Sequence, residues 1–444
     1  MKILFGSAEL SPHVRTGGLG DAVAGLARAL ARDHQVTVAV PGYADVAVQG
    51  RKLPGKPWRR TVDGDISVLF YQDASFDRPG VYGPEPGTSY PENWARYGRF
   101  ARAVAELSQG YDVLHLHDGH VGAAALVTET PTVFTIHNAA YPMLAPLGGA
   151  ESLLGLSETA PESPLEWFGE ANYLKAGIVG ADQVTTVSPG HARELADDAT
   201  SFGLAGITRA LDRPIVGILN GIDTESWDPA TDPALPEAFD AEDLRGRDEN
   251  RTALVERTGL DDGFILANVG RMAAQKGLVL LSYDIDALVA EGFRFVFVGN
   301  GELDSMVDGW AERHPAGVVH LPFAESRARL VFAGTDAYLM PSEFEPCGLG
   351  QMYAMRYGSP TIAHFTGGIE DTVIDVDEDE SSGNGFVFRS FDHPTLTKTM
   401  RRARRYHDAL PDLWVGAQTM GMTRDWSWDA RAAQYVVVYE SVVY

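Results

Sequence analysis

Short apolar runs alternate along the chain with longer segments whose apolar residues recur at helical spacing, as in residues 22–31. Apolar runs of this length, bounded by glycine and polar residues, are typical of buried strands. The expected strands are 3–8, 35–40, 66–71, 113–117, 132–136, 181–187 and 215–219 in the first half, and 264–269, 295–298, 318–321, 337–340 and 361–363 in the second. This repeated order predicts an α/β protein with parallel sheets.

A chain of 444 residues is too long for one hydrophobic core, so we expect two domains. Proline and acidic residues are dense between Asp228 and Asp248, which is typical of a linker, and the strand–helix alternation restarts after it. The predicted domains are therefore 1–227 and 228–427, with residues 428–444 forming a terminal helix.

The net charge of the chain limits the classes of partner that we expect it to bind. The formal net charge is −25, so neither nucleic acid nor an anionic membrane is an expected partner, and an anionic ligand would need locally placed cations. No apolar run reaches membrane-spanning length, and Glu9 comes too early for the core of a signal peptide, so we expect a cytoplasmic protein.

Cys347 is the one cysteine, so neither an intrachain disulfide nor a cysteine-based zinc site can form. It lies in the segment around which the candidate chemistry is organised, between the expected strand 337–340 and an expected helix at 351–357. Glu345 and the turn Gly348–Gly350 come where that strand ends and the helix begins. A helix start offers unpaired N–H groups, and glycine lets an anion approach the backbone. A carboxylate beside an anion cradle suggests a nucleotide sugar as ligand.

Two cations flank a similar turn earlier in the second half. Arg271 follows the expected strand 264–269, and Lys276 lies at the start of the next helix, so both could converge on a diphosphate. The alternative is a pair of solvated surface charges. That alternative is weakened because lysine is rare in this chain yet occurs at this turn.

The glycine-rich turn 15–21 does not fit the common nucleotide-binding motifs. A dinucleotide fingerprint needs Gly-x-Gly-x-x-Gly directly after the first strand, whereas Gly18-Leu19-Gly20 is followed by Val23 and lies well past the strand. A P-loop motif is also absent from the sequence. The pattern therefore excludes a Rossmann dehydrogenase and a P-loop nucleotidase.

Two acidic or histidine-rich segments raise the question of a metal. His115, His117, Asp118 and His120 lie at the end of one expected strand, 113–117, and residues 375–380 contain an Asp-x-Asp pattern. We expect no metal at either: His115 and His117 share a strand face while the others are redirected, and the acidic run is interpreted as a solvated loop.

The run Glu-Pro-Cys-Gly-Leu at 345–349, followed by a helix and Thr366-Gly367-Gly368, resembles the bacterial glycogen and starch synthases. Further motifs of that family follow in order along nearly the whole chain: 15–21, 77–83, 115–120, 135–138, 172–177 and 271–277. The resemblance implies the GT-B architecture, two Rossmann-like doubly wound domains facing across a deep cleft. Residues 1–227 would form the acceptor-side domain, 228–427 the nucleotide-sugar-binding domain, and helix 428–444 would cross back to the first.

The resemblance also implies the site residues. His137 would lie at the reacting carbon of the donor sugar, Glu345 would hold sugar hydroxyls, and Arg271 and Lys276 would hold the phosphates. Phe323 would stack on the base. The substrate-binding set as a whole is Arg15, Gly17, Gly18, Asp21, Tyr82, Asp118, Asn138, Asn220, Phe323, Cys347, Gly348, Leu349 and Gly350.

This sequence departs from the family pattern at three of its motifs. Arg15 replaces a lysine, Gly119 replaces a tryptophan, and Pro142 follows Tyr141 where the family continues with glutamine. Arginine is a planar fork rather than a point donor, which changes the contact that position 15 could make.

The resemblance implies a retaining transferase that moves glucose from ADP-glucose to the non-reducing end of an α-1,4-glucan without metal or cofactor. UDP-glucose is the other donor to consider, and sequence leaves the oligomeric state open. The alternatives are a related transferase that uses glucose 1-phosphate or a short oligosaccharide as acceptor, and a catalytically idle glucan-binding protein. A site needing both domains would close over its substrate and exclude water.

Overall fold

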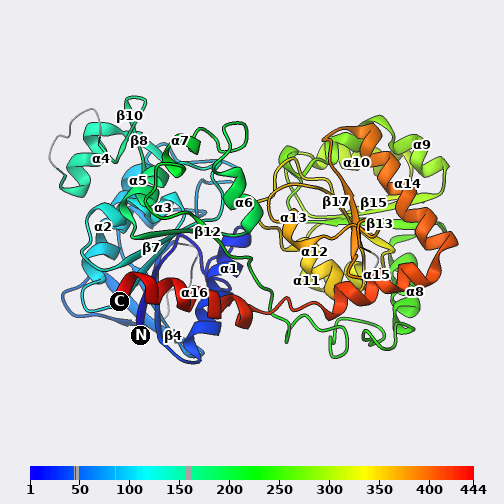
Figure 1. The fold of residues 1–444 in the computed structure, drawn as a ribbon, viewed down its shortest axis with the longest axis horizontal. Coiled ribbons are helices and arrows are strands. Elements are labelled where there is room, and N and C mark those ends of the chain that lie inside the picture. The colour runs from blue at the N-terminus through cyan, green and yellow to red at the C-terminus, as the bar shows by residue number, and fades with distance from the viewer. Residues whose placement is uncertain (45, 47–49, 86, 157–162, 380) are drawn as a thin grey trace. The chain divides into compact units, whose positions relative to one another are not determined.

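The computed structural model describes residues 1–44, 46, 50–85, 87–156, 163–379 and 381–444 (Figure 1). The chain divides into two compact units, Met1–Gly221 with Trp428–Tyr444, and Ile222–Ser427. The expected boundary after residue 227 therefore falls inside the second unit. Ile222 belongs there because its N–H donates to the carbonyl of Trp426, and Trp227 packs on the ring of Tyr353.

The first unit is built on a sheet of order β12-β11-β7-β6-β1-β2-β5-β4-β3. The strands from β12 to β5 pair in parallel, whereas β4 and β3 run antiparallel at the edge. The strands are β1 (Lys2–Gly6), β2 (Gln35–Pro41), β3 (Arg51–Lys52), β4 (Trp58–Asp63), β5 (Ile66–Tyr71), β6 (Val113–His117), β7 (Thr132–Ile136), β11 (Gln183–Thr186) and β12 (Val216–Gly217).

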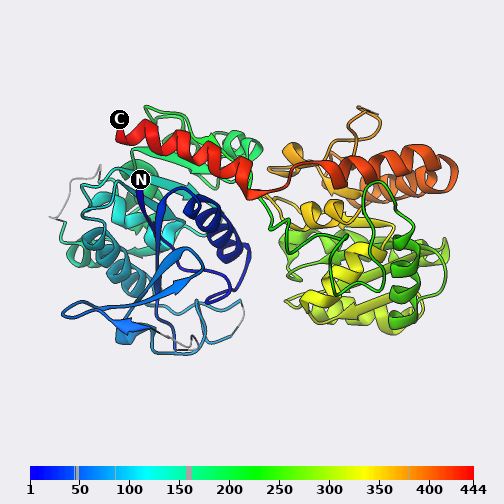
Figure 2. The same cartoon turned by 90° about the horizontal axis from the view of Figure 1, so that it is seen from below.

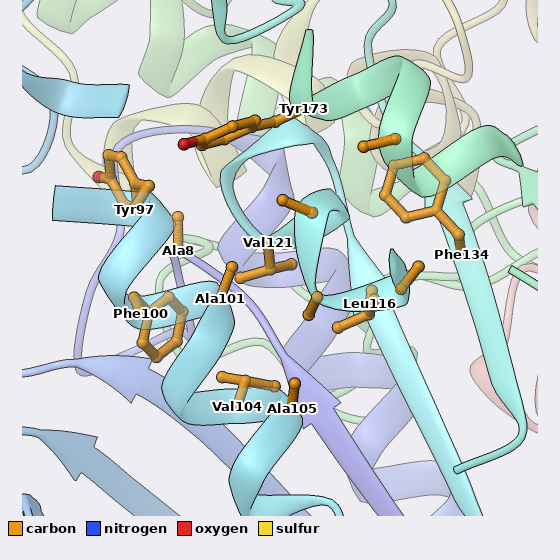
Figure 3. Packing of buried hydrophobic residues seen from close by; sticks show 14 of the residues in the cluster. Ala8, Tyr97, Phe100, Ala101, Val104, Ala105, Leu116, Val121, Phe134 and Tyr173 are labelled. Carbon is orange, nitrogen blue, oxygen red and sulfur yellow. The ribbon is translucent and has the colours of Figure 1, made fainter. Parts of the chain in front are cut away.

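Both faces of this sheet are buried under helices, because side chains alternate between the faces along each strand. Ile3 and Phe5 face a core shared with α1 (Gly18–Ala31) and α16 (Trp428–Val443). Leu4 faces the opposite core, which is covered by α2 (Asn93–Leu107), α3 (Gly119–Gly122), η2 (Ala123–Leu126) and α5 (Tyr173–Gly180). Figure 3 shows side chains of α2 gathered with those of β6 and α3 in this second core.

The last helix, α16, belongs to the first unit although the chain reaches it from the second. It packs beside α1 (Figure 2), and Arg32, the C-cap of α1, makes an ion pair of 2.6 Å with Asp429. The indole of Trp428 lies directly against Gly25, where an added Cβ would overlap it. Glycine at this position therefore allows the close approach of the two helices.

A small antiparallel sheet, β8 (Leu144–Pro146), β10 (Glu170–Asn172) and β9 (Glu166–Trp167), adjoins the first core. The sequence analysis did not predict it, because strands this short carry too few residues to show a period. The remaining elements of the first unit are η1 (Ala74–Phe76), α4 (Leu147–Leu154), α6 (Pro189–Glu194) and α7 (Ala205–Thr208).

The second unit contains a parallel sheet of order β15-β14-β13-β16-β17-β18. Its helices again cover both faces: α8 and α11 pack on one core, and η4, α9, α10, α14 and α15 on the other. The strands are β13 (Phe264–Val269), β14 (Phe293–Val298), β15 (Val318–Leu321), β16 (Ala337–Met340), β17 (Thr361–His364) and β18 (Gly385–Phe388). The helices are α8 (Gly246–Thr258), η3 (Ala274–Lys276), η4 (Leu278–Tyr283), α9 (Ile285–Ala290), α10 (Asp304–Arg313), α11 (Glu325–Gly334), α12 (Gly350–Arg356), α13 (Ile369–Thr372), α14 (His393–Ala409) and α15 (Pro411–Thr423).

The described helices include none that combines the length and the apolar character needed to cross a membrane.

The α1–α16 contact gives a first prediction. Gly25→Ala should destabilise the first unit by about 1–3 kcal/mol, because the new methyl group overlaps the Trp428 indole and overpacking outweighs the better helix propensity of alanine. The matched control is Gly148→Ala in α4 of the same unit, where nothing lies within 4 Å of the added carbon. Thermal unfolding should show a lower midpoint for the first variant and an unchanged or higher midpoint for the second. Equal midpoints would contradict the close packing.

Candidate active site

The candidate residues follow the carboxyl ends of parallel strands, the edge at which open α/β sheets bind ligands. In the first unit Glu9 and the turn 15–21 follow β1, Asp118 follows β6, and His137 and Asn138 follow β7. Because these strands are neighbours in the sheet, their loops lie side by side.

Glu9 is a hub of this edge that the sequence analysis did not single out as a site residue. Its buried carboxylate accepts the N–H groups of Thr16 (2.7 Å) and Gly17 (3.1 Å) through Oε2. Oε1 accepts the hydroxyl of Tyr82 at 2.6 Å. The amide of Gly17 is therefore used inside the protein rather than left for a phosphate, and Gly18 is the residue that opens α1. The one signal in the sequence that could have identified Glu9 is a carboxylate just after a buried strand.

Arg15 is held by a neighbour from its own turn. Its guanidinium pairs with Asp21 at 2.9 Å. Burial raises the pKa of the Asp21 carboxyl, while the charge of Arg15 opposes that rise. The structure thus brings these two predicted residues together as an ion pair at the start of α1.

Asp118 holds the main chain that follows β7. Its Oδ1 accepts the N–H of His137 at 2.7 Å and of Asn138 at 3.3 Å. Its own backbone has φ of 61°, a conformation that side chains rarely adopt and that tends to persist at functional sites. Burial raises the pKa of its carboxyl to about 7.

The histidines of this edge form an aromatic group in which His117 is buried and His120 and His137 are partly buried. His117 Nδ1 lies 3.0 Å from His137 Nε2, and His120 stacks on Tyr82 with ring centres 4.9 Å apart. Burial lowers the pKa of His137 to about 3 and that of His120 to about 4, so both rings are neutral near pH 7. Within the described residues, no group of three or more His, Cys, Asp or Glu is arranged to hold a metal.

In the second unit, Lys276 and Glu345 are direct partners. Lys276 Nζ lies 2.6 Å from Glu345 Oε2, and Ser342 Oγ donates to the same oxygen at 3.0 Å. Both bonds use Oε2, and neither uses Oε1. The carboxylate is buried, whereas the lysine is partly exposed.

Close backbone contact fixes this pair. Gly277, just after Lys276, has φ of 71°, and an added Cβ would overlap the carbonyl of Pro341. Glu343 N–H donates to the carbonyl of Gln275 at 2.9 Å, and the side chain of Gln275 donates back to Phe344. The two turns are therefore locked together, which holds the ammonium beside the carboxylate.

The turn 347–350 is also tightly packed. Gly348 has φ of 75°, and the side-chain amide of Gln351 donates to the carbonyls of Cys347 (2.9 Å) and Gly348 (3.1 Å). Gly350 begins α12 against the ring of Tyr338, where a side chain would clash. Leu349 is the N-cap of α12 and makes no side-chain cap bond in the part of the chain described here.

Residues 2–210 match the starch synthase catalytic domain family, and residues 263–404 match the family of glycosyl transferases group 1. The chain is 39% identical over 480 residues to the glycogen synthase of Alkalilimnicola ehrlichii, covering 99% of each. It is 36% identical over 478 residues to that of Halorhodospira halophila, covering 100% of this chain and 99% of the relative. The chain belongs to the glycogen/starch synthase family.

The fold of this family member agrees with that assignment. The catalytic domain of starch synthase IV from Arabidopsis thaliana superposes with a TM-score of 0.88 at 31% identity, covering 100% of this chain and 99% of that one. Sucrose-phosphate synthase from Thermosynechococcus elongatus, at 17% identity and a TM-score of 0.66, shares the fold. The predicted GT-B fold and hexosyltransferase class are thus confirmed.

Three other predicted residues also follow strands of the two sheets. Arg271 is exposed after β13, and the side chain of Phe323 is 46% exposed after β15. Asn220 is buried after β12 in the first unit, at the edge that also carries His137. All three follow the carboxyl ends of parallel strands, as the family motifs imply.

Two departures from the synthase pattern turn out to be neighbours. A Cβ added to Gly119 would lie 3.3 Å from the carbonyl oxygen of Pro142 and equally close to the N–H of Leu174. That carbonyl accepts the N–H of Leu174 at 3.1 Å. A larger residue at position 119 would push against this backbone pair, so the glycine and the Pro142 segment fit each other.

The acidic run at 375–380 is only partly the solvated loop that we expected. Residues 377–379 are exposed, whereas Asp375 is buried and accepts the N–H of Val387 at 2.7 Å. Arg402 of α14 donates to both Asp375 and Asp377, so the two carboxylates are structural ion-pair partners. The sequence pattern could not show this because Arg402 lies far along the chain. Residue 380 lies outside the described residues.

Asp118 gives a prediction about pH. Because burial raises its pKa from 3.8 to about 7, its contribution to stability is fully present below about pH 4 and is lost as the pH rises to about 7. Relative to Asp118→Asn, the wild type should lose up to about 1.4 kcal/mol of unfolding free energy per pH unit in that window. Urea unfolding of both proteins at several pH values measures this difference. A difference that stays constant would show that the buried carboxyl is ionised throughout.

Proposed function

We propose that this protein transfers glucose from ADP-glucose to the non-reducing end of an α-1,4-glucan, with retention of configuration. Relatives that are 39% and 35% identical to this chain are glycogen synthases, and the related starch synthase IV domain was solved with ADP and acarbose. The observation that carries the proposal is the contact between Lys276 and Glu345. It sets a cation suited to a diphosphate beside a carboxylate suited to sugar hydroxyls.

The second unit would stabilise the leaving diphosphate. As the glycosidic bond breaks, negative charge grows on the phosphate, and fixed donors lower the barrier most when they face that charge. Lys276 uses one N–H for Glu345 and has others to offer, and the exposed Arg271 supplies a second cation. The N–H groups of Gly348–Gly350, at the start of α12, add to them.

Glu345 would orient the sugar rather than attack it. Lys276 and Ser342 both bind Oε2 of this carboxylate, and Oε1 would accept sugar hydroxyls. A carboxylate engaged in this way is a poor nucleophile. A front-face route, in which the leaving phosphate accepts the proton of the acceptor hydroxyl, fits the arrangement and needs no covalent intermediate on the protein.

The first unit would supply the contacts to the donor sugar and the acceptor. Asp118 fixes the backbone of His137 and Asn138, so a ring and an amide are presented after β7. Tyr82 is committed to Glu9 through its hydroxyl and to His120 through its ring. The part of Tyr82 in substrate binding would therefore be apolar contact. Arg15, Asp21 and Asn220 would supply polar contacts from the first unit.

The deciding experiment measures release of nucleoside diphosphate from ADP-glucose and UDP-glucose, with and without glycogen, in EDTA. Glycogen-dependent release from ADP-glucose, undiminished by the chelator, supports the proposal and its metal independence. Release only from UDP-glucose would change the donor, and release only when glucose 1-phosphate replaces glycogen would change the acceptor. Tight glycogen binding without any release would indicate an idle glucan-binding protein. A cytoplasmic location stays a prediction.

Lys276→Ala tests the phosphate contact. Loss of one cationic donor should lower kcat by about a hundredfold or more, equivalent to roughly two to four kcal/mol. The control is Lys398→Ala on α14, where the side chain is exposed and outside the candidate site. The control should turn over at the wild-type rate. Normal turnover by Lys276→Ala, with an unchanged melting midpoint, would remove this residue from the site.

A further inference from the structure

The ring of His137 is tied to a second histidine that the proposed function has not used. His117, the last residue of β6, places Nδ1 3.0 Å from Nε2 of His137. The next residue, Asp118, binds the main-chain N–H of His137. Two consecutive residues of one strand end therefore hold His137, one by its ring and one by its backbone.

The surroundings of His117 decide which way the proton points. His117 is buried, and its Nε2 has no hydrogen-bond partner among the described residues. A buried N–H without an acceptor is rarer in native proteins than a buried acceptor without a donor. The proton of His117 therefore belongs on Nδ1, where it is donated to His137, and the bare Nε2 carries the lone pair.

The proton on Nδ1 of His117 also determines which nitrogen of His137 is protonated. A neutral imidazole that accepts through Nε2 carries its own proton on Nδ1. Burial keeps His137 neutral, with its pKa lowered to about 3. Its side chain is only partly buried, unlike that of His117, and its Nδ1 makes no hydrogen bond within the described part of the chain.

We infer that His117 is a positioning residue that holds His137 as an Nδ1–H donor toward the ligand. This rests on the proposed function, in which His137 faces the donor sugar. The group it meets must then be an oxygen that offers a lone pair, either a sugar hydroxyl acting as acceptor or a ring or bridging oxygen. A ligand with a donor-only group at that point would be disfavoured.

Packing behind His117 keeps its ring in place. The rings of Phe5 and His115 lie 5.0 Å and 4.1 Å away, centre to centre. His115 is anchored in turn by the hydroxyl of Tyr439 on α16 at 2.8 Å and by Thr135 Oγ1 at 2.6 Å. The support for His137 thus extends through two buried imidazoles to the last helix of the chain.

The test reads the tautomer directly. In protein labelled with ¹⁵N-histidine, long-range ¹H–¹⁵N spectra distinguish a protonated Nδ1 from a protonated Nε2, and His137→Gln identifies the His137 signals. The wild type should show His137 protonated on Nδ1. Protonation on Nε2 would overturn the inference, because His117 Nε2 would then hold an orphan N–H or point it at a ring face.

Three variants separate positioning from packing. In His117→Phe, the tautomer of His137 should no longer be fixed, and kcat should fall by about tenfold to a hundredfold with little change in KM. His117→Asn, whose amide can donate from the position of Nδ1, should recover most of that loss and restore the Nδ1–H signal. Tyr439→Phe, which removes the bond to His115 but keeps the histidine pair, should lower stability and leave the tautomer of His137 unchanged.

The outcomes bear separately on the two proposals. If the wild type releases no nucleoside diphosphate, the function proposal fails, whereas the spectra still decide the tautomer. An unchanged tautomer and kcat in a folded His117→Phe protein would refute the role of His117 while leaving the transferase intact. If kcat falls equally in His117→Phe and His117→Asn, and neither variant fixes the tautomer of His137, the asparagine amide cannot replace the imidazole of His117. That result would still support His117 as the residue that makes His137 an Nδ1–H donor.

Discussion

Parallel pairing between neighbouring strands is the constraint on which this protein depends. It forces each strand to return through a crossover helix, and it places the loops that follow β1, β6 and β7 at one edge of the first sheet and those that follow β13, β15 and β16 at one edge of the second. Residues far apart in sequence are thereby gathered into polar clusters. The strands supply the rigidity that a site of several hydrogen bonds needs.

Within each cluster, a buried carboxylate organises the groups around it. Glu9 gathers two N–H groups and a tyrosine hydroxyl, Asp118 gathers two N–H groups, and Glu345 gathers an ammonium and a serine hydroxyl. A buried carboxylate without hydrogen-bond donors would cost free energy. Each of these carboxylates therefore favours the loop conformation that supplies its donors. The loops are therefore preorganised before any substrate binds.

Sequence predicted the frame of the fold, for identifiable reasons, whereas the roles of the motif residues stay predictions. Strands such as 113–117, 132–136, 264–269 and 337–340 coincide with those observed because buried strands are rich in apolar, β-branched and aromatic residues, although some carry histidine, threonine or asparagine. The hub at Glu9 escaped prediction because two of its partners are main-chain N–H groups, which leave no mark in the sequence, and the third, Tyr82, comes from a distant loop. The small sheet 144–172 lacks periodicity, and Asp375 was misjudged because Arg402 neutralises it from another helix. Local patterns report local structure, and long-range polar partners leave no local trace.

The place of α16 bears on how the protein is made. The face of the first sheet that carries Ile3 and Phe5 is covered by α1 and α16. Tyr439, which holds His115 through its hydroxyl, lies on α16. The residues of α16 follow the second unit in the sequence. The apolar face shared by α1 and α16 therefore cannot be fully covered until the second unit has been synthesised, although the rest of the first unit is translated earlier. The nascent first unit exposes part of this face in the meantime, and the docking of α16 is the step that completes both this core and the support of His137.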